Sequence, residues 1–297
     1  MPDFLSRLQT AGVLIADGAM GTMLQQAGLP RRVPPERWNL ENPAAVRQVG
    51  RSYVEAGANL ILTNTFGGSR IRLDKDQLGA RVAEINRAAV RLAHEAAEDQ
   101  ALVVGDMGPT GELLQPVGPL DYAEAVNAFA EQAAALAEAG VAALLVETLS
   151  DLNEARAAVE GARRATDLPL LVTFSFDTHG RTMMGLKPAQ AAKEIWALGV
   201  TAVGANCGRT LSETLTAIQA MRQAVPEATL MAKPNAGLPR VEGENEMVYD
   251  VTPAEMAEYA LKFSAQAVKI FGGCCGSTPA HIRAVAEKLK GSQPAGV

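Results

Sequence analysis

Residues 267–276 read Ala-Val-Lys-Ile-Phe-Gly-Gly-Cys-Cys-Gly, an apolar run of the kind that forms strands, followed by a glycine-rich loop. The same arrangement occurs at residues 201–208, which read Thr-Ala-Val-Gly-Ala-Asn-Cys-Gly. Short apolar runs with β-branched residues are typical of parallel strands that are buried on both faces. These two stretches therefore predict buried strands whose carboxyl ends carry reactive side chains.

Similar runs recur along the chain, so that the predicted strands are 13–16, 60–63, 102–105, 143–146, 170–174, 202–204, 230–232 and 268–271. Amphipathic helical stretches lie between them, including 81–98, 122–139, 153–165 and 279–289. Eight strand–helix units in 297 residues favour a single (β/α)₈ TIM barrel over an open doubly wound sheet. We therefore predict an α/β protein with one barrel over 1–290. The remainder, 291–297, is expected to be a flexible tail or the start of an interdomain linker.

The composition excludes several classes of function. With 48% hydrophobic and 20% charged residues, the chain can bury a large core. The net charge of −6 and the lack of a long basic cluster argue against nucleic acid or an anionic membrane as a partner. We find no apolar run near the ~20 residues of a membrane-spanning helix, and no secretory signal in the first ten residues. Three cysteines, two of them adjacent, suit a reducing compartment, so we expect a cytoplasmic protein.

Polar side chains follow the predicted strands. The carboxyl ends of all strands in a parallel barrel open on one rim, where we therefore expect the active site. Some of the polar residues, Asp106 and Asp177 among them, are interpreted as turn formers or helix caps. That interpretation does not explain why every cysteine lies on the same rim. The rim set is Asp17, Asn64, Thr65, Asp106, Glu147, Ser175, Asp177, Asn206, Cys207, Asn235, Cys274 and Cys275.

The cysteines Cys207, Cys274 and Cys275 form a set with a specific chemistry. Three thiolates with a vacant fourth position are a ligand set of catalytic zinc. A substrate thiol that binds as fourth ligand loses its proton and becomes a nucleophile. The flanking glycines allow two adjacent side chains to turn toward one metal. Two alternatives stay open at this point: buried, inert thiols, and a phosphate-binding loop after the eighth strand.

Five motifs together resemble the homocysteine S-methyltransferase family: Asp-Gly-Ala-Met-Gly-Thr-Met at 17–23, Thr-Asn-Thr-Phe at 63–66, Gly-Ala-Asn-Cys at 204–207, Lys-Pro-Asn-Ala-Gly at 233–237 and Gly-Gly-Cys-Cys-Gly at 272–276. The resemblance covers roughly residues 5–289. Within the family it is greatest to the homocysteine-binding module of cobalamin-dependent methionine synthases. It implies a zinc barrel that binds L-homocysteine through sulfur and methylates it to methionine. The implied methyl donor is methylcobalamin, bound by another module or by a separate corrinoid-binding protein.

The resemblance also assigns roles to residues. The three cysteines match the family's zinc ligands. Asp17 and Glu147 are expected to hold the ammonium group, which agrees with the preference of ammonium for carboxylates. Asn235 is a candidate temporary zinc ligand or substrate gate. The full set of expected substrate-binding residues is Asp17, Gly18, Thr63, Thr65, Glu147, Asn206 and Asn235.

The sequence leaves other functions open. Betaine or S-methylmethionine could replace the corrinoid as donor, or the chain could be a homocysteine- or zinc-binding subunit without turnover. A phosphate-handling barrel lyase would need no zinc. Lys233, at the end of the seventh strand, could form a Schiff base. A salt-bridged or solvated lysine is the favoured reading, because zinc ligands flank it on both sides.

Overall fold

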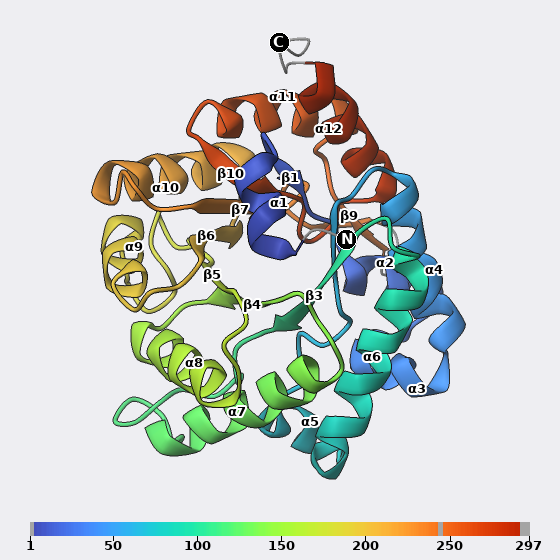
Figure 1. The fold of residues 1–297 in the computed structure, drawn as a ribbon, viewed down its shortest axis with the longest axis vertical. Coiled ribbons are helices and arrows are strands. Elements are labelled where there is room, and N and C mark those ends of the chain that lie inside the picture. Colours follow the sequence, from blue (N-terminus) through green and yellow to red (C-terminus); the bar gives the residue numbers. More distant parts are fainter. Residues whose placement is uncertain (1–2, 243–245, 292–297) are drawn as a thin grey trace.

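The computed structural model describes residues 3–242 and 246–291. Eight parallel strands form one sheet in the order β1-β10-β7-β6-β5-β4-β3-β2. A parallel bridge between Ala16 and Leu60 joins the first and last strands of this order. The sheet therefore curls into a barrel with helices around it, as Figure 1 shows. The predicted (β/α)₈ architecture is confirmed.

The barrel strands are β1 (Leu14–Ile15), β2 (Leu60–Leu62), β3 (Leu102–Met107), β4 (Ala143–Leu149), β5 (Leu170–Phe174), β6 (Ala202–Cys207), β7 (Leu230–Pro234) and β10 (Val268–Phe271). Four of them, β3, β4, β6 and β7, continue past the predicted ends. The apolar pattern stops where inward-facing positions become polar, but strand pairing continues beyond that point. Cys207, for example, still pairs with Pro234. Several rim residues are thus the last residues of strands rather than members of loops.

The helices are α1 (Phe4–Thr10), α2 (Met20–Gln26), α3 (Trp38–Glu41), α4 (Pro43–Glu55), α5 (Arg70–Asp74), α6 (Val82–Ala97), α7 (Tyr122–Glu138), α8 (Leu152–Ala165), α9 (Pro188–Trp196), α10 (Leu211–Ala224), α11 (Pro253–Ser264) and α12 (Pro279–Gly291), with 3-10 turns η1 (Pro35–Arg37) and η2 (Gly79–Arg81). Asp121 and Asp151 accept backbone hydrogen bonds at the starts of α7 and α8. A hairpin that the sequence did not predict, β8 (Arg240–Glu242) and β9 (Glu246–Val248), follows β7. Of the expected tail, only Gly291 belongs to the described residues, and it ends α12.

The interior of the barrel changes character along the strands. Its lower part is an apolar cluster in which Phe4 and Leu8 of α1 pack on inward-facing strand residues such as Leu60, Leu102 and Leu145. Side chains of a strand alternate between its faces, so every second residue faces inward. Nearer the carboxyl ends, these inward residues become polar. This upper layer contains Asp106, Glu147, Thr173, Asn206 and Lys233, all of them buried. The fold thereby places polar groups at the carboxyl rim.

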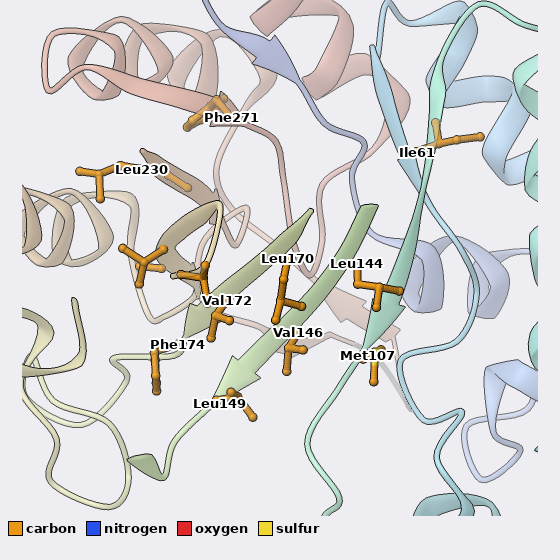
Figure 2. Close-up of a cluster of buried hydrophobic side chains, with 14 of the residues drawn as sticks. Ile61, Met107, Leu144, Val146, Leu149, Leu170, Val172, Phe174, Leu230 and Phe271 are labelled. Atoms are coloured by element: carbon orange, nitrogen blue, oxygen red, sulfur yellow. The ribbon is translucent and has the colours of Figure 1, made fainter. Parts of the chain in front are cut away.

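A second apolar core lies between the strands and the surrounding helices. Outward-facing residues such as Ile61, Val146, Val172 and Phe271 belong to it, as Figure 2 shows. The alternation of inward and outward residues explains why these strands are apolar on both faces. Among the described residues, no helix is long and apolar enough to span a bilayer.

Candidate active site at the carboxyl rim of the barrel

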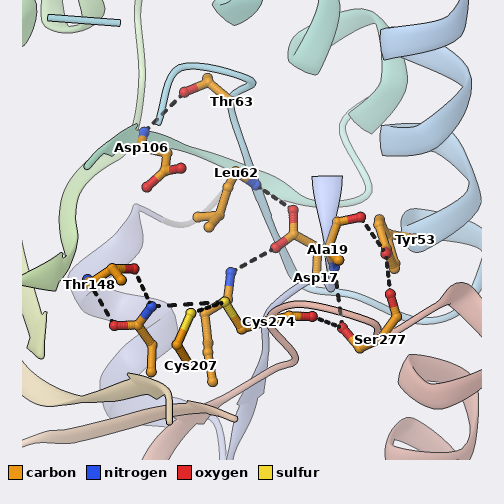
Figure 3. A network of polar contacts seen from close by, with 12 residues as sticks. Asp17, Ala19, Tyr53, Leu62, Thr63, Asp106, Thr148, Cys207, Cys274 and Ser277 are labelled. Atoms are coloured by element: carbon orange, nitrogen blue, oxygen red, sulfur yellow. Dashed lines mark hydrogen bonds and ion pairs between the residues drawn. The ribbon is translucent and has the colours of Figure 1, made fainter. Parts of the chain in front are cut away.

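The three cysteines meet at the rim although two of them are distant in sequence from the third. Cys207 ends β6, whereas Cys274 and Cys275 lie in the loop between β10 and α12. Their sulfur atoms all lie within 4.8 Å of one another, and the Sγ atoms of Cys207 and Cys274 are 3.0 Å apart (Figure 3). Zinc–sulfur bonds of about 2.3 Å in a tetrahedral site place ligand sulfurs about 3.8 Å apart. The cluster therefore has the size to hold one ion.

Backbone geometry aims these side chains at one point. Cys207 has φ of 53°, in the left-handed region that costs a non-glycine residue roughly 1–2 kcal/mol. Gly276 has φ of 77°, and the Tyr249 ring fills the space that a Cβ atom would occupy there. The backbone N–H of Cys274 donates to the Pro234 carbonyl at 2.9 Å. Local strain and a fixed loop are consistent with a functional arrangement of thiols.

The close packing of three thiols shapes their ionisation. Hydrogen bonds from Cys207 and Cys274 lower the pKa of Cys275 to about 4. Hydrogen bonding to Cys274 and Cys275, with burial, raises the pKa of Cys207 well above its usual value. For Cys274, the hydrogen bond from Cys207 lowers the pKa, but the bond to Cys275 and burial raise it to about 12. Three thiolates so close together need a cation among them, because like charges disfavour ionisation. The donor set thus fits a soft divalent metal such as zinc.

A cavity of about 640 Å³ opens above the cysteines. It is lined by all three cysteines and by four of the seven expected substrate-binding residues: Gly18, Thr63, Thr65 and Glu147. The other three, Asp17, Asn206 and Asn235, are not among the residues that line it. The rim thus brings the expected residues into one region, but only some of them line the cavity.

Asp17 lies beneath the cavity in a buried ion pair. Its Oδ1 accepts from Lys233 Nζ at 3.1 Å, and its Oδ2 accepts from the backbone N–H of Leu62 at 2.7 Å (Figure 3). Both side chains of the pair are 2% exposed. Burial opposes the charge of Lys233, but the carboxylates of Asp17 and Glu147 outweigh it and raise the pKa of the lysine. The favoured reading of Lys233 as a salt-bridged residue is confirmed, and a charged ammonium is no Schiff-base nucleophile.

Two asparagines hold the ends of strands together. Asn206 Oδ1 accepts from the Thr148 backbone N–H and from Thr173 Oγ1, each at 2.8 Å. Its Nδ2 donates to Thr148 Oγ1 at 2.6 Å and contacts Cys274 Sγ at 3.9 Å. Asn235 Nδ2 donates to a loop carbonyl at 2.8 Å, while its Oδ1 is buried without a partner. These contacts tie the cysteines to β4, β5 and the segment after β7.

Asp106 is not the turn former or helix cap that the sequence suggested. It belongs to β3 and is 5% exposed, with its side chain on the cavity wall. Its backbone N–H donates to Thr63 Oγ1 at 3.0 Å, and its carbonyl accepts from Thr65 Oγ1 at 2.7 Å. The apolar run that precedes it in the sequence gave no signal for this inward position. Asp177, in contrast, stays local, since its Oδ1 accepts from Thr178 Oγ1 at 3.0 Å.

Two carboxylates on the cavity wall lack complete hydrogen bonding. Asp106 Oδ1 and Glu147 Oε2 are buried atoms without a partner among the described residues. Burial raises the pKa of Glu147 to about 8, and burial followed by the nearby Glu147 charge raises the pKa of Asp106 well above its usual range. Unpaired carboxylates are costly to bury. The arrangement is therefore suited to a cationic group of a ligand.

Comparison with known proteins gives consistent findings. A sequence model described as homocysteine S-methyltransferase matches residues 14–289. The methionine synthases of Mycobacterium tuberculosis (strain ATCC 25618 / H37Rv) and Mycobacterium leprae (strain TN) are 34% and 33% identical over 293 and 294 residues. The matched region is 92% of this chain but 24% of either relative, so the chain spans about a quarter of their length.

Solved structures resemble the fold. The metallated form of the homocysteine methyltransferase MmuM from Escherichia coli has a TM-score of 0.80 at 23% identity, covering 95% of this chain and 98% of that one. The oxidized form of the same protein has a TM-score of 0.79 at 25% identity, covering 95% and 97%. At this level of identity the structural likeness supports the barrel architecture.

Proposed function

The chain belongs to the homocysteine S-methyltransferase family, and from this premise we propose that it methylates L-homocysteine to L-methionine in a zinc-dependent reaction. One observation carries the proposal: three thiols within 4.8 Å of one another form part of a cavity wall that also bears unpartnered carboxylate oxygens. A thiol-bearing amino acid has a sulfur for the first feature and an ammonium group for the second.

Each group of the site has a task in this proposal. Cys207, Cys274 and Cys275 would hold zinc, which supplies Lewis-acid stabilisation of a bound thiolate. Glu147 would receive the ammonium group through its unpartnered oxygen. Gly18 lines the cavity without a side chain, so its backbone is available to the ligand carboxylate. Methyl transfer forms a sulfur–carbon bond as the donor–carbon bond breaks, and the donor leaves with the electron pair.

Asp17 acts indirectly in this proposal. Its two oxygens already accept from Lys233 and from the Leu62 backbone, and it does not line the cavity. We infer that it fixes Lys233 and the end of β2 beneath the ligand. Thr63 and Thr65 similarly hold the backbone of β3 through their hydroxyl groups.

The methionine synthase relatives support methylcobalamin as the methyl donor, presented by a corrinoid-binding module or protein. Because the chain covers about a quarter of those relatives, the corrinoid would come from outside the described residues. Betaine and S-methylmethionine are the small-molecule alternatives. Zinc chemistry at the thiol is the same for all three donors.

The test is methionine formation by reduced, zinc-loaded protein supplied with homocysteine and methylcobalamin. We expect methionine from the wild type and none above background from Cys207→Ala, together with loss of about one zinc per chain by elemental analysis. Ser212→Ala serves as the matched control, because this exposed residue of α10 lies close to Cys207 in sequence and outside the cavity.

The outcomes separate the possibilities. Full activity of a zinc-free Cys207→Ala protein would overturn the zinc-thiolate proposal. Zinc retention with methionine formed only from betaine or S-methylmethionine would replace the corrinoid as donor. Binding of homocysteine without turnover under any donor would assign the chain as a binding subunit.

A further inference from the structure

Two loops of the site lie side by side and have different tasks in the proposed function. Residues 272–277, the metal loop, contain two of the three cysteines and lie between β10 and α12. Residues 17–19, the anchor loop, lie between β1 and α2 and bring Gly18 to the cavity wall. The backbone N–H of Gly273 donates to the Asp17 carbonyl at 2.9 Å, so the two loops are in direct contact.

Ser277 joins the two loops through its side chain. Its Oγ donates to the Cys274 carbonyl at 2.7 Å and accepts from the Ala19 backbone N–H at 3.2 Å, as Figure 3 shows. Ser277 is fully buried. A buried hydrogen bond is electrostatically stronger than one in water, because the surrounding dielectric constant is low. The hydroxyl group of Ser277 therefore fixes a cysteine of the metal loop against the anchor loop.

Tyr53 of α4 adds a second connection, from outside the barrel. Its hydroxyl oxygen lies 3.0 Å from the carbonyl oxygen of Ala19 and 3.0 Å from that of Ser277 (Figure 3). A tyrosine hydroxyl has a single proton to donate, so the two carbonyls share it. The side chain of Tyr53 is fully buried as well. One side chain from the helix layer thus contacts both loops.

Close packing leaves no room for the loops to approach each other further. A Cβ atom at Gly18 would lie 2.7 Å from Ser277 Oγ and 2.8 Å from Tyr53 Oη, nearer than such atoms normally approach. A Cβ atom at Gly273 would overlap with the Ser277 side chain. Hydrogen bonds hold the loops together, while these contacts keep them apart. The separation of the two loops is therefore set by Tyr53 and Ser277.

We propose that Tyr53 and Ser277 are positioning residues that fix the separation of the metal loop and the anchor loop, and that this separation selects the thiol amino acid by its chain length. This inference rests on the proposed function, since it places the ligand's sulfur at the metal loop and its carboxylate at the anchor loop. Homocysteine has two methylene groups between its sulfur and its Cα atom, whereas cysteine has one. At a fixed separation, the shorter ligand loses contact with one of the two loops.

The test measures this selectivity by binding, without a methyl donor. Zinc-loaded protein is titrated calorimetrically with L-homocysteine and with L-cysteine. For the wild type we expect homocysteine to bind about 10- to 200-fold more tightly, the range for one methylene group. In Tyr53→Phe, which keeps the ring and removes one hydroxyl group, this preference should fall by about three- to tenfold, the effect of one hydrogen bond, with zinc content unchanged.

Ser277→Ala is the second variant, because it removes the other hydroxyl group that joins the loops, and it decides the test if Tyr53→Phe does not fold. Tyr122→Phe is the matched control, since the hydroxyl group of this tyrosine donates to Glu160 at 3.0 Å, outside the cavity lining. The control should keep the wild-type preference. A merely structural role would weaken the binding of both amino acids by the same factor, so an unchanged preference in either folded variant would overturn the proposal.

The failure of the proposed function gives a different pattern. If the zinc-loaded wild type binds neither amino acid, the assignment of homocysteine falls, and the selection by chain length falls with it. If the wild type binds both with equal affinity, thiol binding stands but the selection by chain length is wrong. A reduced preference in the folded variants, with the wild-type preference kept in Tyr122→Phe, supports the role of Tyr53 and Ser277.

Discussion

The lower and upper parts of the barrel interior are built from the same strands, but burial of their side chains has opposite effects on the free energy of folding. Leu145 in the lower part is fully buried among apolar side chains, whereas Glu147, the next inward residue of β4, is buried with an unpartnered oxygen. Burial of the leucine stabilises the fold by roughly 1.5–3 kcal/mol, while burial of an unpaired carboxylate opposes folding. Two residues along one strand thus separate the part that holds the barrel together from the part that is available for a ligand.

The largest effect should come from removing a thiol of the upper part. Cys275→Ala leaves two sulfur ligands, so we expect loss of bound zinc and a fall of methionine formation to the uncatalysed level. The metal-free forms of variant and wild type should unfold at similar temperatures, since no apolar core contact is removed. Elemental analysis, a methionine assay and thermal unfolding followed by circular dichroism check this prediction. A large fall in the unfolding temperature would show that the two parts of the interior are not separable.

The converse experiment changes the lower part. Leu145→Ala should lower the free energy of unfolding by about 2–5 kcal/mol, because it removes buried methyl groups and leaves a cavity. Urea unfolding measures the loss. At a temperature where the variant is still folded, zinc content should equal that of the wild type. Reduced zinc binding by a folded Leu145→Ala protein would contradict the separation of roles.

Sequence patterns were sufficient for the barrel and for the cysteine cluster. Short apolar runs at regular spacing indicate parallel strands, and the rim position of each cysteine follows from the strand that precedes it. Four strands, β3, β4, β6 and β7, were predicted too short at their carboxyl ends. Polar residues such as Asn206 end the apolar signal, whereas hydrogen bonding between neighbouring strands continues through them.

Roles that depend on partners far away in sequence could not be predicted. Asp17 and Lys233 are separated by 216 residues, so no local pattern shows that they form an ion pair. Asp106 has the sequence context of a turn or cap, and only its neighbours in the segment after β2 and on β4 reveal an inward carboxylate. The strained backbone of Cys207, with φ of 53°, also has no signature in an Asn-Cys-Gly segment.

Glu147→Gln is expected to raise the free energy of unfolding of the ligand-free protein, by less than Leu145→Ala lowers it. Burial raises the pKa of Glu147 from 4.5 to about 8 in the folded state. Because the carboxyl pKa is raised in the folded state, the contribution of Glu147 to the free energy of unfolding is most favourable below pH 4.5, and it declines as the pH rises to about 8. Glutamine carries no charge, so this variant should be more stable than the wild type above pH 8, by at least about 1.4 kcal/mol, the value of one pKa unit.

Urea unfolding of both proteins at pH 5 and pH 8.5 tests this sign. The advantage of Glu147→Gln should be larger at the higher pH, while its affinity for homocysteine should be lower than that of the wild type. Equal stability differences at the two pH values would mean that Glu147 is already compensated in the ligand-free protein. In that case Glu147 would not be an uncompensated charge that a cationic group of the ligand could neutralise.

The smallest effect should come from an ion pair outside both parts of the interior. Lys288 and Glu258 form a pair between α12 and α11, with side chains 41% and 60% exposed. Water screens such a pair, so Lys288→Ala should change the free energy of unfolding by less than about 1 kcal/mol, measured in urea at low and high salt. The buried pair of Asp17 and Lys233 differs in kind, since removing Lys233 would leave a carboxylate uncompensated below the cavity. A loss of free energy of unfolding for Lys288→Ala as large as that for Leu145→Ala would contradict this prediction. It would mean that burial does not decide how much a side chain contributes to the stability of this barrel.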